Sequence, residues 1–135
     1  MKKKFLLKKI ISILKKKGLS KKHSKISANY LIEAELFDAR SHGITRLKMY
    51  CDRIKKGLIN TKPKIKVKNI NSSVSYIDAD NCIGFVAAEI GIDKAIQNAK
   101  KTGIGLVAVK KSGHYGLSRF YAERAVKKKL IVFCF

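Results

Sequence analysis

Gly105 to Tyr121, with the sequence GLVAVKKSGHYGLSRFY, is the stretch that decides the fold. Leu106 to Val109 is a short apolar run rich in β-branched residues, which predicts a buried strand. Ser112 to Gly116 is a polar turn with a histidine between two glycines, and a helical spacing of apolar residues follows it. The inner side of that helix is expected to hold Leu117, Phe120, Tyr121, Ala125 and Val126. Because open α/β sheets bind ligands where a strand ends before a helix, His114 is the first candidate for chemistry.

Two helices are predicted at the start of the chain. Gly18 is placed to end the first helix, and Ser20 can cap the second, which would run to about Phe37. The inner stripe of the first helix would hold Phe5, Leu6, Lys9, Ile10, Ile13 and Leu14. The second would turn inward Ile26, Tyr30, Leu31, Ala34 and Leu36. The two helices together predict an αα-hairpin.

A third helix is predicted from about Ile44 to Lys56, stopped by Gly57. His42, Arg46 and Tyr50 recur every four residues, so they would share one face if the helix begins early enough. Such a row could bind a carboxylate, since a guanidinium offers two parallel hydrogen bonds to its oxygens. An exposed arginine and a capping histidine are the alternative that the spacing leaves open.

The remaining segments alternate between extended and helical patterns. In order they are an extended edge segment at 58–71, a strand at 74–78, a helix at 84–101, the strand and helix of the central stretch, and a last strand at 130–135. This order predicts an α/β fold in which helices cover a mixed sheet. Residues 1–60 would be an N-terminal helical segment, and residues 61–135 the start of an α/β domain that is incomplete, because the chain stops inside the last strand.

The charge of the chain is strongly positive. There are 31 basic residues against 9 acidic ones, for a net charge of +22. Such a charge is typical of proteins that bind nucleic acid or an anionic membrane. Here the lysines are scattered through every segment, with no arginine-rich arm and no aromatic residues between them, which favours solvated lysine faces. A basic nucleic-acid-binding module is therefore kept only as an alternative.

The cysteines and the N-terminal sequence indicate where in the cell the protein is expected to be. Cys51, Cys82 and Cys134 are odd in number and have no C-x-x-C spacing, so neither a disulfide framework nor a metal site is expected. Lys8 and Lys9 interrupt the first apolar run before it reaches the length of a signal peptide. A cytoplasmic location and no membrane association are expected.

One glycine motif is misleading. Gly103, Gly105 and Ala108 match the pattern G-x-G-x-x-A of dinucleotide-binding folds. That fingerprint requires the glycines to follow a strand and open a helix, whereas here they follow a helix and open a strand. We therefore expect no phosphate-binding role for them.

Several blocks, in this order and spacing, resemble the N-terminal part of the type 2 malate/L-lactate dehydrogenase family. That family also includes ureidoglycolate and sulfolactate dehydrogenases and piperideine carboxylate reductase. The matching blocks are Ala34-Glu35-Leu36, Ser41-His42-Gly43, Arg46-Leu47, Tyr50, Gly57-Leu58-Ile59-Asn60, Ile77-Asp78, Gly84, Gly103 to Val109, Ser112, His114, Gly116 and Tyr121 to Ala125. The resemblance runs through nearly all 135 residues.

The resemblance implies a hydride transfer between NAD or NADP and the C2 carbon of a small 2-hydroxy or 2-keto acid. His114 matches the residue that moves a proton to or from the oxygen, and an imidazole suits that role. Arg46 matches the residue that holds the substrate carboxylate, while Ser41, His42 and Tyr50 would line the substrate pocket. The family's cofactor contacts lie mostly beyond the matched region, so none is assigned here. The complete enzyme is expected to be a homodimer.

Three function classes follow. The first is an oxidoreductase, acting with a remainder or present as a truncated form. The second is an inactive, degenerate remnant of that enzyme. The third is the basic nucleic-acid-binding module.

Overall fold

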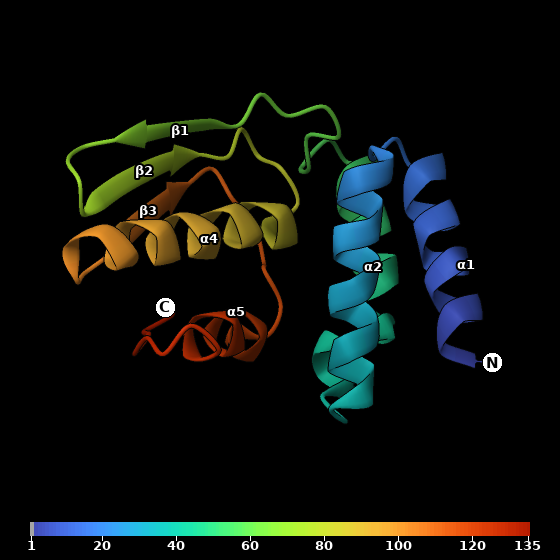
Figure 1. Cartoon of the computed structure of the whole chain (residues 1–135). Helices are drawn as coiled ribbons and strands as arrows, with labels where there is room; N and C mark the ends of the chain where they lie inside the picture. Colours follow the sequence, from blue (N-terminus) through green and yellow to red (C-terminus); the bar gives the residue numbers. More distant parts are fainter. Residues whose placement is uncertain (1) are drawn as a thin grey trace.

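The computed structural model describes residues 2–135, in which a group of helices stands beside a small sheet layered with two further helices (Figure 1). The predicted α/β class is confirmed. Within the described part of the chain, every helix is too short or too polar to cross a bilayer.

Helices α1 (Lys2–Lys16) and α2 (Lys21–Leu36) form the predicted hairpin. The Ser20 side chain caps α2 by accepting a hydrogen bond from the His23 backbone N–H at 3.1 Å. Of the predicted inner residues of α1, Ile10 and Leu14 are buried. The residues predicted to face inward but found exposed are Phe5, Leu6, Lys9, Ile13 and Leu36. The expectation for α1 is wrong at its exposed positions, because α1 packs mainly on α2, which covers a narrower stripe of α1 than predicted.

The third predicted helix begins later than expected. Two 3₁₀ turns, η1 (Arg40–His42) and η2 (Ile44–Arg46), precede α3 (Leu47–Lys55). A carboxylate oxygen of Glu35 accepts a hydrogen bond from the Ile44 N–H at 3.1 Å. Residues 44–46 form a 3₁₀ turn and the α-helix begins only at Leu47, so the prediction of one helix beginning at residue 44 is wrong.

The sheet is mixed, as predicted, with strand order β1-β2-β3. Strand β1 (Lys66–Asn69) pairs antiparallel with β2 (Val74–Asp78), which pairs parallel with β3 (Leu106–Lys110). Helix α4 (Gly84–Thr102) connects the two parallel strands and covers one face of the sheet (Figure 1).

Strand β3 is present but is not the buried strand that its apolar sequence predicts. Leu106 is 54% exposed and Val109 is 39% exposed. Their exposure comes from tertiary packing, because β3 is an edge strand and α4 covers only one face of it. The prediction of burial is therefore wrong for this strand.

Helix α5 (Ser118–Val126) follows the turn after β3, and its residues Phe120, Tyr121 and Ala125 are buried as predicted. Val126, also predicted inside, is 62% exposed. Residues 130–135 do not form the predicted last strand, since no strand among residues 2–135 pairs with them. They lie extended, with alternate side chains packed on the core.

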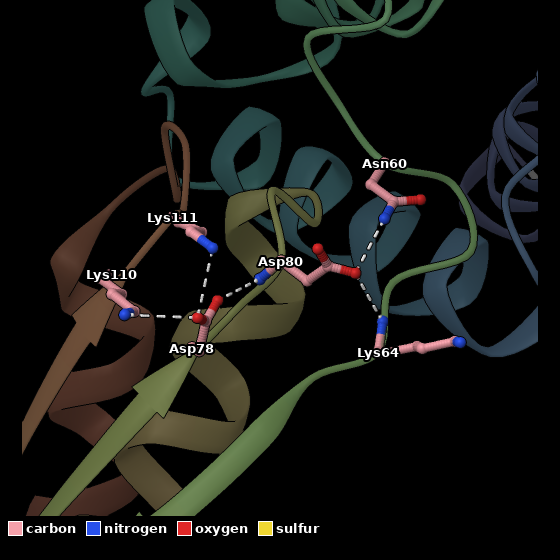
Figure 2. Close-up of polar contacts among 6 residues, drawn as sticks. All are labelled: Asn60, Lys64, Asp78, Asp80, Lys110 and Lys111. Atoms are coloured by element: carbon pink, nitrogen blue, oxygen red, sulfur yellow. Dashed lines mark hydrogen bonds and ion pairs between the residues drawn. The ribbon is translucent and has the colours of Figure 1, made fainter.

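Polar contacts fix the carboxyl ends of the strands (Figure 2). The Asp80 carboxylate accepts hydrogen bonds from Asn60 Nδ2 and from the Lys64 N–H, each at 2.9 Å. The Asp80 N–H donates to Asp78 Oδ1 at 3.1 Å. The lysines paired with Asp78, each at 3.5 Å, are Lys110 and Lys111. These contacts hold the loop after α3 and the ends of β2 and β3 together.

An aromatic cluster joins the helical hairpin to α4 and α5. Tyr30 stacks on Phe85 with ring centroids 5.6 Å apart. The Tyr50 ring also contacts Phe85, with centroids 5.1 Å apart. Tyr30 also contacts Phe120 and Tyr121. All five aromatic side chains are buried. The core therefore runs through both halves of the chain.

The two glycines of the misleading motif have structural roles. Gly103 ends α4 in a left-handed conformation, with φ of 82°. A Cβ on Gly105 would overlap the Ala95 carbonyl oxygen and lie 2.9 Å from the Ala99 nitrogen. Gly105 therefore lets the chain pass directly against α4 as it enters β3.

We predict that Gly105→Ala destabilises the fold by about 1–3 kcal/mol, the usual cost of overpacking a tight contact. Urea unfolding followed by circular dichroism measures this. Gly113→Ala is the matched control, because a Cβ there meets no atom within 4 Å. Equal unfolding midpoints for Gly105→Ala and the unchanged chain would contradict the close-approach argument.

Candidate active site

His114 lies in the turn between β3 and α5, directly against the start of α4. A Cβ on Gly84, the first residue of α4, would overlap the backbone carbonyl oxygens of Gly113 and His114. The absence of a side chain at Gly84 therefore lets the loop that carries His114 pack directly against the first residues of α4. The histidine is held at the carboxyl end of a parallel strand, as the sequence predicts.

The His114 ring is bonded to Tyr50 of α3, a residue 64 positions away in the sequence. The Tyr50 hydroxyl and His114 Nδ1 are 2.6 Å apart. Tyr50 is buried, and its burial raises the pKa of its phenol, which therefore keeps its proton at neutral pH. The contact fixes the imidazole and leaves Nε2 as the ring nitrogen available to a ligand.

The other three predicted residues lie next to this pair. The His42 and His114 rings stack with centroids 5.6 Å apart and an interplanar angle of 26°. Ser41 Oγ lies 3.0 Å from His42 Nδ1. Arg46 Nε donates a hydrogen bond to the Ser41 carbonyl oxygen. The structure thus brings together all five residues proposed from the sequence.

The route by which they meet differs from the prediction. His42 belongs to η1 and Arg46 to η2, so His42, Arg46 and Tyr50 do not form one continuous helical row. Gly43 separates the two turns, with φ of −87° and ψ of −147°. The chain therefore folds back at Gly43, which places the His42 ring on His114 rather than one turn above Arg46.

The electrostatic environment disfavours a charged His114. Burial lowers the pKa of His114, and electrostatic interactions with the neighbouring His42 and with the guanidinium groups of Arg46 and Arg53 lower this pKa further. The ordinary value is 6.5. The ring is therefore neutral at pH 7 and able to accept a proton.

Arg53 is a residue of the site that the sequence analysis missed. With Tyr50 and His114 it lines an enclosed cavity of about 40 Å³, whose other lining residues include Asn81, Ser112 and Gly113. A sequence signal was available, because Arg53 follows Arg46 and Tyr50 at helical spacing on α3. The predicted row runs from His42 through Arg46 to Tyr50 and does not include Arg53.

The arrangement combines a neutral imidazole with two guanidinium groups, one from the turn η2 and one from α3. It can exchange a proton at Nε2 and bind an anionic group beside it. No cluster of three or more His, Cys, Asp or Glu side chains within residues 2–135 could hold a metal ion.

Comparison with known proteins gives a consistent result. The family model described as malate/L-lactate dehydrogenase matches residues 1–135. The chain is 40% identical over 122 residues to a malate dehydrogenase of Pyrococcus abyssi, covering 90% of this chain and 34% of that protein. It is 38% identical over 122 residues to a malate/(S)-sulfolactate dehydrogenase of Methanothermus fervidus, covering 90% and 36%.

Solved structures agree with the sequence comparison. The malate dehydrogenase of Pyrococcus horikoshii OT3 has a TM-score of 0.89 at 39% identity, over 93% of this chain and 36% of that one. The sulfolactate dehydrogenase of Methanocaldococcus jannaschii has a TM-score of 0.90 at 35% identity, over 95% and 37%. The chain spans about a third of the length of these relatives. With the family model matching its whole length, the chain belongs to the malate/L-lactate dehydrogenase family.

Proposed function

We propose that this chain supplies the proton-transfer and carboxylate-binding part of an NAD- or NADP-dependent 2-hydroxy acid dehydrogenase. The observation that supports this most is the Tyr50–His114 hydrogen bond, which holds an imidazole next to His42 and Arg46. Membership of the family agrees with the same reaction class.

His114 is proposed as the group that moves the proton. When the hydroxy acid is oxidised, the neutral ring carries its proton on Nδ1 and donates it in a hydrogen bond to the Tyr50 hydroxyl oxygen, so that Nε2 has a free lone pair. Nε2 then accepts the proton of the C2 hydroxyl, and the ring becomes an imidazolium. In the reverse direction the imidazolium returns that proton to the carbonyl oxygen. Tyr50 is a positioning residue, because its phenol bonds Nδ1 and sets the direction of Nε2.

Arg46 is proposed to hold the carboxylate next to the reacting carbon. Its Nε donates a hydrogen bond to the Ser41 carbonyl oxygen and its Nη1 contacts Met49 Sδ at 3.9 Å, which fixes the guanidinium plane and leaves the Nη2 N–H groups for an anion. Ser41 and His42 are proposed to line the same pocket, as their contacts with each other and with His114 suggest.

The nicotinamide cofactor would supply the hydride acceptor. Residues 103–108 do not fit its phosphates, because Gly105 faces the backbone of α4 rather than an open cradle. The chain corresponds to about a third of the length of its relatives. We therefore propose that the cofactor contacts come from the part of the relatives that lies beyond the matched third, and we assign no cofactor contact to residues 1–135.

The proposal extends to location and assembly. Three cysteines without a disulfide agree with a cytoplasmic enzyme, and resemblance to the family implies a homodimer of the complete protein. Scattered lysines give no support to a nucleic-acid-binding role.

We predict distinct kinetic effects for the two main residues in a chimera that joins residues 1–135 to the remaining two thirds of the Pyrococcus abyssi relative. His114→Ala should lower kcat by about 10²- to 10⁴-fold, the usual contribution of a positioned acid or base. Arg46→Lys should raise the apparent KM for the keto acid, because a point charge replaces a planar fork. If His42→Ala abolished turnover and His114→Ala left kcat nearly unchanged, proton transfer would belong to His42.

We also predict that the pKa of His114 lies below 6.5, since burial and neighbouring cations favour the neutral ring. Because the unfolded chain binds this proton more tightly, stability associated with His114 is present above about pH 6.5 and is lost as pH falls through the folded pKa. An NMR titration of the ring proton on Cε1, assigned with His114→Gln, measures the value. A midpoint at or above 6.5 would contradict the stated environment.

A further inference from the structure

The turn at residues 112–116, which carries His114, has no hydrogen bonds between its own backbone and any other backbone group of residues 2–135. Its backbone accepts one hydrogen bond from a side chain of the described chain. The Tyr121 hydroxyl donates to the Tyr115 carbonyl oxygen at 2.6 Å. A turn without a ladder of backbone bonds takes its shape from packing and from such side-chain contacts.

Tyr121 is suited to hold this carbonyl because it is itself held by the core. It lies on α5, and its side chain is 2% exposed. Its ring contacts Tyr30 of the helical hairpin, with centroids 5.1 Å apart, and Tyr115, with centroids 5.6 Å apart. Burial raises the pKa of the Tyr121 phenol, so the hydroxyl keeps the proton that it donates.

The other contacts of the turn are packing contacts against α4. Gly84 lies against the carbonyl oxygens of residues 113 and 114. Gly116 has φ of 83°, and a Cβ there would lie 2.7 Å from the Phe85 ring. These contacts limit how close the turn can come to α4, but they do not fix the direction of a peptide group. The hydrogen bond from Tyr121 does, because it orients the peptide group that follows Tyr115, one residue after the histidine.

We propose that Tyr121 is a positioning residue for proton transfer, because its hydroxyl fixes the turn in which the His114 imidazole meets the Tyr50 hydroxyl. This inference rests on the proposed function, in which His114 moves the proton. Tyr121 acts through the backbone of the turn, since its hydroxyl is bonded to the Tyr115 carbonyl and not to the imidazole. Without this bond the turn moves away from α5, and the imidazole leaves Tyr50 and becomes more exposed to water.

The test is an NMR titration of the histidine rings in the 135-residue chain, with Tyr121→Phe removing the donor and keeping the aromatic ring. The pKa of His114 should rise toward its ordinary value of 6.5, because a more exposed ring loses the burial that lowers it. The proton of the neutral ring, held on Nδ1 by Tyr50, should redistribute between both nitrogens, which their ¹⁵N shifts report. A role in stability alone would lower the melting temperature and move neither signal.

Matched variants remove other hydroxyl groups of the same region. Tyr115→Phe removes a hydroxyl of the turn, which contacts Ser118 Oγ at 3.2 Å, and keeps the carbonyl that Tyr121 binds. Tyr30→Phe removes a hydroxyl from the same aromatic cluster. Both should leave the pKa and the proton position of His114 unchanged. Tyr121→4-aminophenylalanine places an N–H donor where the hydroxyl was, and should restore both toward those of the unchanged chain.

Kinetics of the chimera described above connect the position of the ring to turnover. Tyr121→Phe should lower kcat by about tenfold to 10²-fold, since a misplacement of about 1 Å can cost about 10²-fold. The KM for the keto acid should change little, because Arg46 belongs to η2 and not to the turn. Tyr115→Phe should keep the kcat of the unchanged chimera.

The positioning role is overturned if Tyr121→Phe leaves the His114 signals or kcat unchanged, or if Tyr115→Phe or Tyr30→Phe shifts the signals equally. It is also overturned if Tyr121→Phe does not fold while Tyr30→Phe does, because the hydroxyl then serves the fold alone. The titration needs no substrate, so all of these results leave the proposed function standing. The proposed function fails by a different result, in which His114→Ala keeps the kcat of the chimera while Tyr121→Phe still shifts the His114 signals.

Discussion

The hydrogen bond between Tyr50 and His114 is the constraint on which the site depends. It joins a helix of the N-terminal segment to the turn after β3, so it forms only when the two halves of the chain pack correctly. Phe85 holds Tyr50 in place, because its ring contacts both Tyr50 of α3 and Tyr30 of the helical hairpin. The geometry of the imidazole is therefore a property of the shared core rather than of the local turn. A glycine at position 84 completes this arrangement by admitting the turn against α4.

Burial first, and then the surrounding charge, disfavour the protonated form of the His114 imidazole. Most of the nine acidic residues are engaged elsewhere, in ion pairs such as Arg124–Asp93 or in structural hydrogen bonds such as that from Asn60 to Asp80. Among the described residues, no carboxylate is hydrogen-bonded to His42 or His114. An imidazolium therefore lacks the anionic partner that would stabilise it. The same excess of positive charge favours the approach of anionic substrates.

Local sequence signals predicted the elements well where the cause was local. The Ser20 cap, the glycine that ends α4 and the alternating strands each lie where spacing and capping chemistry placed them. The failures have tertiary causes. Exposure of β3 depends on what covers the sheet. Gly43 lies so close to Glu35 that a Cβ there would overlap the Glu35 carboxylate. Neither tertiary contact is visible in a window of sequence. The five site residues came from motif resemblance and spacing, whereas Arg53 was missed.

The central claim is that His114, oriented by Tyr50, faces the C2 oxygen of a 2-hydroxy or 2-keto acid. A crystal structure of the chain with bound oxamate, a stable analogue of a 2-keto acid, tests it most directly. The account predicts the analogue's C2 oxygen within about 2.6–3.2 Å of His114 Nε2, with its carboxylate on Arg46. An analogue whose C2 oxygen meets His42, or whose carboxylate lies away from Arg46, would contradict it.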